Sequence, residues 1–461
     1  MKNLLGAILL LVIVCACSSR SNTASYSWNK DYHQRLLTDF CITKAQVKDY
    51  IKKYIPDVTE EQMQSWEKSG ALECMTLDGE KRYFRNAGPN LFRIDSTCQR
   101  IKAEKEKESQ DLEGWHLDDY KNIPCIMTSI NQSHGNYLAE PKHITITYTL
   151  TVNPDAVPNG KLVRCWLPYP RTDIARQKDV RLISVSESKF ILSPPDSIHS
   201  TLYMEKYASK GKPTVFQEKF EYTIYGEWHP LKPEDVQPYD TTSTIYQKYT
   251  SQRATHIIFT PQIRQLAANL TSGTNNPLIK AQRIYRWIND RFPWASAREY
   301  STIPNIPEYV LANKHGDCGQ VSLLFITLCR ASGIPAHFQS GFMIHPHENN
   351  LHDWAEVYFQ GIGWVPVDQS FGIPTFLSDN KAAEFFFLGG IDSYRFIVNN
   401  DYSGALSPAK KYPRSETVDF QRGEVEWNGG NLYFPQWDYH MTKLKDCATI
   451  LSWLMASILN L

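Results

Sequence analysis

The chain has 461 residues, of which 42% are hydrophobic and 21% are charged, and its 49 basic and 49 acidic residues leave a net charge of zero. This composition is that of a globular protein, and the length exceeds what one hydrophobic core usually supports, so we expect two or three domains. The balanced charge argues against a nucleic-acid partner, which would require a basic surface.

The first 16 residues have the form of a secretory leader. Lys2 is followed by an apolar run, Leu4 to Val14, that is too short to span a bilayer as a stable helix. The segment Val14-Cys15-Ala16-Cys17-Ser18-Ser19 resembles a bacterial lipoprotein box, which implies acylation of Cys17; ordinary cleavage after small residues is the alternative. With lipidation, residues 17–29 form a flexible tether to the membrane. We therefore expect a protein anchored in the bacterial cell envelope, on a periplasmic or surface-facing side.

Residues 30–130 predict a small α+β module. The patterns favour helices at Ala45 to Tyr54, Glu60 to Lys68 and Cys98 to Ser109, and short strands at Arg82 to Phe84 and Leu91 to Ile94. No motif in this module carries recognisable chemistry, so we interpret it as a scaffold or spacer.

Residues 131–240 predict a β-sandwich. From Ile144 to Val152, apolar residues alternate with polar ones, as expected for a half-buried antiparallel strand. Further strand patterns, separated by turn residues, follow at Leu162 to Leu167, Val180 to Val185, Thr201 to Glu205 and Phe216 to Tyr225. The proline-rich stretch from His229 to Asp240 then reads as a linker.

Residues 250–400 predict an α+β domain that opens with two helices. Thr260 and Asn276 each precede a proline, which is a favourable pairing of an N-cap with the first helical position. In the second helix, Ala281, Ile284 and Ile288 form an inward stripe that is typical of core packing.

Cys318 has the setting of a thiol nucleophile. It lies in Lys314-His315-Gly316-Asp317-Cys318-Gly319-Gln320, directly before a helical pattern that Gly333 and Pro335 end. The unpaired N–H groups and the dipole of a helix N-terminus stabilise an anion, so we expect an ionised Cys318. The alternative, a small buried residue, is common for a lone cysteine.

His352 and Asp368 are the candidate base and orienter. His352 opens a strand pattern that runs to Phe359, and Trp364 to Asp368 reads as the returning strand. A two-residue turn would put the two side chains on opposite faces, because side chains alternate strictly along a strand. We therefore predict a three-residue loop or a bulge, after which both side chains share one face with Trp354, and Asp368 fixes the imidazole tautomer.

These motifs resemble the core of the transglutaminase-like superfamily. The matching segments are Gly316-Asp317-Cys318-Gly319, His352-Asp353-Trp354-Ala355-Glu356-Val357 and Gly363-Trp364-Val365-Pro366-Val367-Asp368, within roughly residues 250 to 375. The resemblance implies a papain-like order of catalytic Cys318, His352 and Asp368. It also implies acyl transfer from an amide through a thioester, to water or to an amine.

Further residues near these motifs are candidates for other roles. The backbone N–H of Cys318 is one expected oxyanion donor, and Trp294 and Tyr300 are candidates for a second donor or for lining the cleft. His345, His347, His352 and Asp353 could suggest a metal site, but Pro346 makes the segment a loop that holds ligands poorly. We expect neither a metal nor another cofactor.

Residues 401–461 predict a C-terminal extension that packs on the body. Aromatic residues gather at Phe385 to Phe387 and from Trp427 to Trp437, where they either line a substrate groove or pack against the sheet. The apolar tail from Cys447 to Leu461 is too short to span a membrane. Four cysteines of the N-terminal region lie close enough in sequence for disulfides to be considered, namely Cys41, Cys74, Cys98 and Cys125.

The sequence thus predicts an envelope-anchored cysteine enzyme of transglutaminase-like fold. In this hypothesis Cys318 attacks an amide of a peptide, protein or glycopeptide, His352 transfers the proton, and Asp368 orients His352. Hydrolysis, as in a peptidase or amidase, is favoured because nothing marks a channel that would shield a thioester from water. The alternatives are a cross-linking transglutaminase with an amine acceptor, and a peptide- or glycan-binding module without chemistry.

Overall fold

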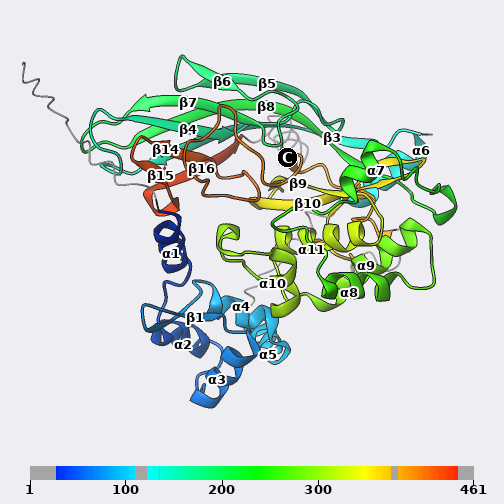
Figure 1. Ribbon diagram of the computed structural model, residues 1–461, viewed down its shortest axis with the longest axis horizontal. Coiled ribbons are helices and arrows are strands. Elements are labelled where there is room, and N and C mark those ends of the chain that lie inside the picture. The colour runs from blue at the N-terminus through cyan, green and yellow to red at the C-terminus, as the bar shows by residue number, and fades with distance from the viewer. Residues whose placement is uncertain (1–26, 110–121, 134, 375–382, 445–461) are drawn as a thin grey trace, which may run out of the picture.

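The computed structural model describes residues 27–109, 122–133, 135–374 and 383–444. The leader, Cys17, most of the tether and the tail from Cys447 lie outside these ranges, so the expectations for them stay predictions. Figure 1 shows a pair of β-sheets at one end of the molecule, a helical region around a smaller sheet next to it, and a small helical unit at the far end. Within the described ranges, no helix has the length and apolarity needed to cross a membrane.

The N-terminal unit is mostly helical. Its elements are α1 (Trp28–Asp39), α2 (Lys44–Lys52), α3 (Glu60–Ser69), β1 (Cys74–Leu77), β2 (Glu80–Tyr83), α4 (Ala87–Ile94) and α5 (Ser96–Ser109). Thr43 and Thr59 begin α2 and α3 with capping boxes, in which side chain and backbone satisfy each other's hydrogen bonds. The unit has its own core, which includes Phe40, Tyr83 and Phe84.

One expectation for this unit is wrong, and the open question of disulfides between its cysteines is answered in part. Leu91 to Ile94, predicted as a strand, belong to helix α4. A short apolar run fits a buried helix as well as a strand, and Pro89 stands in the first turn, where a helix tolerates it. Cys41, Cys74 and Cys98 are free thiols, so they form no disulfide among themselves.

The β-sandwich contains the five strands that the alternation predicts. They are β3 (Leu138–Val152), β4 (Leu162–Pro168), β5 (Gln177–Val185), β7 (Thr201–Tyr207) and β8 (Thr214–Trp228). A further short strand, β6 (Phe190–Leu192), pairs with β7. In one sheet the strand order is β12-β8-β3-β16, with β5 also paired to β8, and in the other it is β15-β14-β4-β7-β6. Trp166, Phe220 and Trp437 lie in the core between them.

Strands from late in the chain complete both sheets. They are β12 (Gly390–Ile391), β14 (Glu424–Trp427), β15 (Gly430–Leu432) and β16 (Trp437–Leu444). β16 pairs along β3 from Val152 to Thr145, and β14 pairs with β4. The sandwich thus draws strands from outside 131–240, and Trp437, one of the late aromatic residues, packs in its core. Figure 1 shows these strands, in orange and red, within the sandwich.

The remaining region combines helices with a four-stranded sheet, which confirms the predicted α+β fold. Its helices are α6 (Asn122–Gln132), α7 (Thr244–Tyr249), α8 (Pro261–Thr271), α9 (Pro277–Arg291), α10 (Ile306–Asn313) and α11 (Cys318–Ala331). The sheet has the order β11-β10-β9-β13, from β9 (Ala336–Ile344), β10 (Asn349–Phe359), β11 (Gly363–Val367) and β13 (Arg395–Asn399). Thr260 and Asn276 cap α8 and α9 as predicted.

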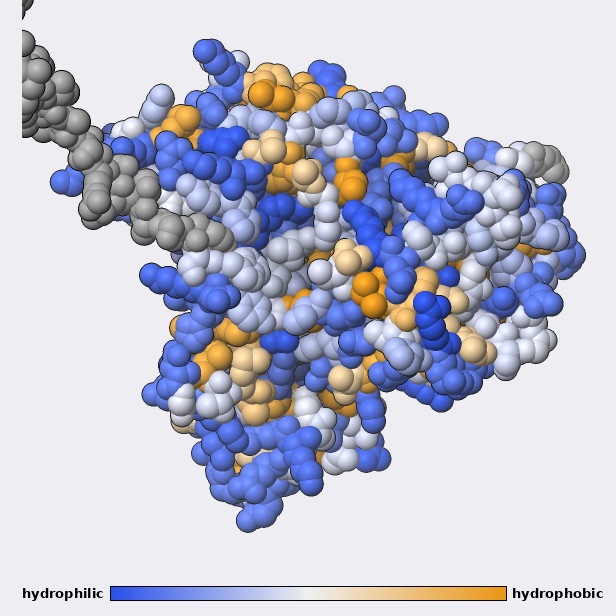
Figure 2. All heavy atoms as spheres, in the orientation of Figure 1, coloured by the Kyte–Doolittle hydropathy of each residue, from blue (hydrophilic) through white to orange (hydrophobic). Residues whose placement is uncertain are grey.

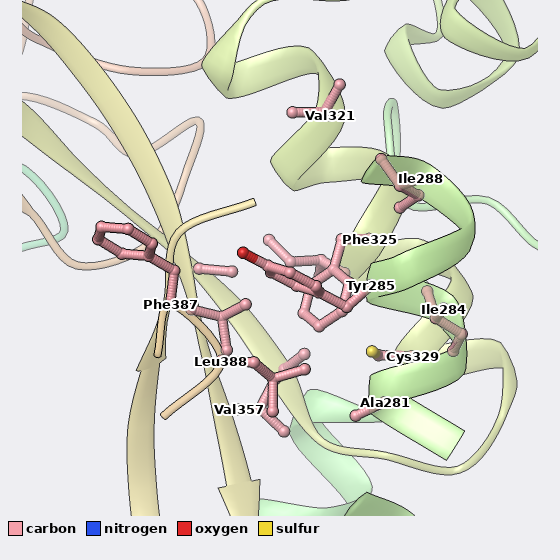
Figure 3. Close-up of a cluster of buried hydrophobic side chains, with 14 of the residues drawn as sticks. Ala281, Ile284, Tyr285, Ile288, Val321, Phe325, Cys329, Val357, Phe387 and Leu388 are labelled. Carbon is pink, nitrogen blue, oxygen red and sulfur yellow. The ribbon is translucent and has the colours of Figure 1, made fainter. Parts of the chain in front are cut away.

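Helices α9 and α11 pack together against the sheet. Figure 3 shows Ile284 and Tyr285 of α9 beside Phe325 and Cys329 of α11, facing Val357 of the sheet. The stripe predicted for α9 is therefore core, and its burial fixes α11 on one face of strand β10.

The hairpin between β10 and β11 has the predicted loop. Phe359 pairs with Gly363, so three residues lie between the strands, and Gly361 and Gly363 have φ angles of +89° and +109°. Positive φ angles of this kind are accessible mainly to glycine. With this register, His352 and Asp368 share one face of the sheet, as expected.

The surface in Figure 2 is largely hydrophilic, with scattered apolar groups. Exposed apolar side chains include Ile183 of β5 and all three residues of β6. Single exposed apolar groups are ordinary for a globular protein.

Gly341 is a point where the sheet tolerates no side chain. A Cβ atom at this position would lie 1.9 Å from the backbone oxygen of Phe396 in β13. We predict that Gly341→Ala lowers the free energy of unfolding by about 1–3 kcal/mol, because β13 must shift to make room. Thermal denaturation checks this, and an unchanged melting temperature would contradict the packing of β13 on β9.

Candidate active site

Helix α11 begins at Cys318 and is fixed by a capping box. Asp317 is the N-cap: its Oδ1 accepts from the N–H of Gln320 at 3.1 Å, and Oε1 of Gln320 accepts from the N–H of Asp317 at 3.2 Å. The N–H groups of Cys318 and Gly319 belong to the unpaired first turn. Cys318 as a whole residue is partly exposed.

The thiol lies at a cavity of about 330 Å³. The cavity wall comes from distant parts of the chain: Trp294 and Tyr300 precede α11, Asp353 comes from β10, and Asp419 and Arg422 come from the segment before β14. The N-terminal unit contributes Asn86.

Asp353 is the side chain in contact with the thiol. Sγ of Cys318 donates to Oδ2 of Asp353 at 3.4 Å, and the hydroxyl of Tyr300 is also 3.4 Å from that oxygen. The other oxygen of Asp353 accepts from Nε2 of Gln421 at 2.9 Å. The Tyr300 hydroxyl donates to Asp317 at 2.7 Å, which ties the helix cap to the same cluster.

Gly319 makes this close approach possible. A Cβ atom at Gly319 would lie 2.3 Å from the hydroxyl of Tyr300 and 2.6 Å from Oδ2 of Asp353. The glycine after the cysteine is therefore required by the packing of the site.

His352 and Asp368 form a hydrogen-bonded pair on the other face of the sheet. Nε2 of His352 lies 2.7 Å from Oδ2 of Asp368, as the hairpin register predicts. Successive side chains of a strand point to opposite faces. Asp353 faces α11, as Ala355 does, whereas His352 lies on the face of Trp354, which packs into the sandwich core. The structure thus joins His352 to Asp368 but places neither against Cys318.

The electrostatics of Cys318 differ from the sequence-based expectation. Burial, followed by the negative charges of Asp353 and Asp317, raises the pKa of the Cys318 thiol well above its usual value. Burial also raises the pKa of Asp353, with a further contribution from Asp317. This direction opposes the ionised sulfur expected from the helix N-terminus, because burial and, after it, the nearby carboxylates disfavour the thiolate.

The pair on the other face has a different charge state. Burial lowers the pKa of His352, although Asp368 partly offsets this effect, so the imidazole is neutral. Burial alone would raise the pKa of Asp368, but His352 and Arg395 outweigh it and lower the pKa. Nη2 of Arg395 is 3.0 Å from Oδ2 of Asp368. A buried, charge-compensated network therefore joins β10, the end of β11 and β13 within the four-stranded sheet.

Trp294 and Tyr300 both border the cavity. The side chain of Trp294 is 40% exposed, and its backbone pairs with that of Gly316, two residues before the thiol. The Tyr300 hydroxyl already donates to Asp317, so Trp294 is the freer of the two to contact a substrate. Their role as oxyanion donors stays a prediction.

The N-terminal unit positions the loop that carries Trp294. The side chain of Asn90 makes two hydrogen bonds to the backbone of Ser296, at 2.8 and 2.9 Å, and the guanidinium of Arg93 lies 5.0 Å from the Trp294 ring centre. This unit, interpreted from sequence as a scaffold or spacer, therefore supports one wall of the cavity.

Sequence reasoning missed the roles of Asp353 and of the segment from Asp419 to Arg422. A signal for Asp353 exists, because it stands on the apolar side of the strand with Ala355 and Val357. The later segment has no motif. In the described part of the chain, no group of three or more His, Cys, Asp or Glu residues is arranged to hold a metal ion.

Residues 264–369 match the sequence profile of the Transglutaminase-like superfamily. This segment is a transglutaminase-like domain. It contains α8, α9, α11 and the β10–β11 hairpin, and it ends just after Asp368.

Two curated proteins are similar to part of this chain. YebA of Bacillus subtilis, an uncharacterized protein, is 26% identical over 130 residues, which cover 24% of this chain and 18% of YebA. An uncharacterized protein of Haemophilus influenzae is 26% identical over 179 residues, covering 33% of this chain and 46% of that protein. The chain therefore spans less than half the length of either relative.

Solved structures resemble the chain more distantly. A candidate cysteine protease from Cytophaga hutchinsonii has a TM-score of 0.44 at 13% identity, covering 67% of this chain and 93% of that one. The periplasmic domain of TgpA from Pseudomonas aeruginosa has a TM-score of 0.27 at 13% identity, covering 55% of this chain and 99% of that domain.

We predict that Asp353→Asn makes Cys318 more reactive toward iodoacetamide at neutral pH. Alkylation requires the thiolate, and removal of the Asp353 charge lowers the pKa of the thiol. The alkylation rate of the variant should therefore begin to rise at a lower pH than that of the wild type. Mass spectrometry of the Cys318 peptide across a pH series measures this shift.

His352→Gln is the matched control, because it changes the neighbouring residue on the other face of β10. It should leave the alkylation profile close to that of the wild type. A profile that moves with His352→Gln and not with Asp353→Asn would contradict the Cys318–Asp353 contact.

Proposed function

We propose that the transglutaminase-like domain carries out thiol-dependent acyl transfer on amide bonds, with Cys318 as the nucleophile. The observation that carries this proposal is the thiol of Cys318 at a helix N-terminus, beside a cavity and 3.4 Å from a carboxylate that can accept its proton. Family membership supports the same chemistry.

The reaction needs one group that moves a proton, and Asp353 is placed for it. As sulfur attacks the amide carbonyl carbon, the thiol proton passes to the Asp353 carboxylate. The N–H groups of Cys318 and Gly319 face the developing oxyanion, and Trp294 is the candidate further donor. Asp353 then gives its proton to the leaving amine, which departs and leaves a thioester on Cys318.

Hydrolysis of the thioester reverses these transfers. Water attacks the thioester carbonyl while Asp353 takes its proton, and the carboxylic acid product leaves as sulfur regains a proton. Burial raises the pKa of Asp353 and so makes its carboxylate a better proton acceptor.

In this proposal His352 and Asp368 are positioning residues. Their bond, with Arg395, holds the buried face of β10, and Gln421 joins that strand to the cavity by donating both to the carbonyl of His352 and to Asp353. The sequence motif predicts His352 as the base instead. If Asp353 is the base, a substitution of Asp353 should abolish most activity, and if His352 is the base, a substitution of His352 should do so.

We favour hydrolysis over amine transfer, because the site opens to solvent through the partly exposed Cys318 and Trp294. The substrates proposed are peptide, protein or glycopeptide amides of the bacterial envelope. An envelope location rests on the leader pattern and on lipidation of Cys17, which would also give the protein its contact with the membrane.

A binding module without chemistry is the second candidate function. The raised pKa of the Cys318 thiol favours it, and so does the position of His352 on the far face of the sheet. A binder would hold a peptide or glycan in the cavity without forming a covalent bond to sulfur.

We predict that the protein cleaves or deamidates envelope peptides, as measured by product masses with and without a primary amine. Cys318→Ala should abolish turnover, and Asp353→Asn should lower kcat by about 10²–10⁴, the usual contribution of a positioned acid-base group. His352→Gln should lower kcat by a smaller factor, since it removes no group in contact with sulfur.

Two outcomes would contradict this prediction. Amine adducts among the products would support transfer to an amine instead of hydrolysis. Loss of activity in His352→Gln alone would show that His352, and not Asp353, is the base. Unchanged masses with all peptides would favour the binding module.

A further inference from the structure

We propose that the cavity beside Cys318 contains a subsite for an organic cation, centred on Asp419, which selects substrates with an ammonium or guanidinium group near the amide. The link to catalysis rests on the proposed function, whereas the binding of the cation does not. Peptides with lysine or arginine side chains, or with free amino groups, belong to this chemical class.

The carboxylate of Asp419 has no partner of its own. The residue is only 6% exposed and borders the cavity, yet its side chain makes no hydrogen bond or ion pair with any described residue. Only its backbone oxygen is engaged, by the guanidinium of Arg414. The carboxylate oxygens of Asp419 are not sealed in the protein interior, so a ligand in the cavity can reach them.

The cations of the cavity wall are already engaged. Arg422 binds Glu299 at 2.7 Å and Glu416 at 2.6 Å. Arg298 points toward Glu73, at 3.8 Å, and lies over the ring of Tyr309. The wall contains five carboxyl groups, of Glu299, Asp317, Asp353, Glu416 and Asp419, against the two guanidinium groups. Among the described residues, no cation forms an ion pair with the other three carboxyl groups of the wall, those of Asp317, Asp353 and Asp419.

The titration of Asp419 agrees with a missing cation. Burial, followed by the charges of Glu416 and Asp353, raises the pKa of Asp419 well above its usual value, although Arg422 and Arg414 act in the opposite direction. A bound ammonium group would favour the ionised form and lower this pKa. Binding of a cation should therefore strengthen as pH rises and Asp419 ionises.

The position of Asp419 relative to the thiol is fixed by its neighbours in the chain. Gln421, two residues later, donates to the carbonyl of His352 at 3.0 Å and to Asp353 at 2.9 Å. The segment is thus attached to β10 beside the residue that contacts Cys318. A substrate that places its amide at the sulfur would place a nearby cationic group between Asp353 and Asp419, whereas a neutral group there would leave Asp419 unpaired.

The test measures binding separately from turnover. The full chain with Cys318→Ala is titrated, by ligand-observed NMR, with N-acetyl-lysine methylamide and with its neutral counterpart N-acetyl-norleucine methylamide. We expect the lysine probe to bind about tenfold more tightly or better, as for one charge-assisted hydrogen bond. Asp419→Asn should remove this preference and Asp419→Glu should retain it, while Asp57→Asn, at an exposed site of the N-terminal unit, should change nothing.

Equal affinity for the two probes, or a preference that persists in Asp419→Asn, would overturn the subsite. If Asp419→Asn does not fold, a pH series with the Cys318→Ala protein decides: affinity for the lysine probe should rise with pH, and a flat profile would overturn the proposal. Selective binding without cleavage of any lysine-containing amide by the wild type would refute the proposed function and leave the subsite intact. Cleavage of lysine and norleucine amides alike would refute the subsite and leave the proposed function intact.

Discussion

The strict alternation of side chains along strand β10 is the constraint on which the site depends. Helix α11 is held against one face of this strand by the apolar contacts of α9 and α11, so the thiol at its first residue can meet only the side chains of that face. Asp353 lies on that face and His352 on the other. A shift of β10 by one residue relative to α11 would therefore decide whether the sulfur faces a carboxylate or an imidazole.

The cavity is assembled from segments that are far apart in the chain, and each is fixed by its own contacts. The N-terminal unit holds the Trp294 loop through Asn90, and the segment before β14 is fixed by Gln421 on β10. That segment stays in place because β14 and β16 are strands of the sandwich. The sandwich and the N-terminal unit thus shape the site while most of their residues lie away from it, which explains why a domain of 106 residues is built into a much longer chain.

Local patterns allowed much of the fold to be predicted. Thr260 and Asn276 marked helix starts, the alternation from Ile144 to Val152 marked a strand, and the parity of His352 and Asp368 required the three-residue loop. Local patterns failed where tertiary contacts decide. Leu91 to Ile94 became helical, and the face of β10 that meets α11 depends on packing that spacing does not record. The charge around Cys318 was missed because Asp419 and Glu416 reach the cavity from about 100 residues away in sequence.

The protonation state of Cys318 distinguishes a sulfur that faces Asp353 from one that faces His352. An infrared difference spectrum between the wild type and Cys318→Ala at neutral pH isolates the S–H stretching band of this one thiol. The account predicts a band typical of a hydrogen-bonded thiol, because burial and two carboxylates raise the thiol pKa and Asp353 accepts the S–H bond. The band should move when Asp353 is replaced by Asn. An absent band would reveal a thiolate, as expected for sulfur beside an imidazolium, and would contradict the arrangement of β10 on which the account rests.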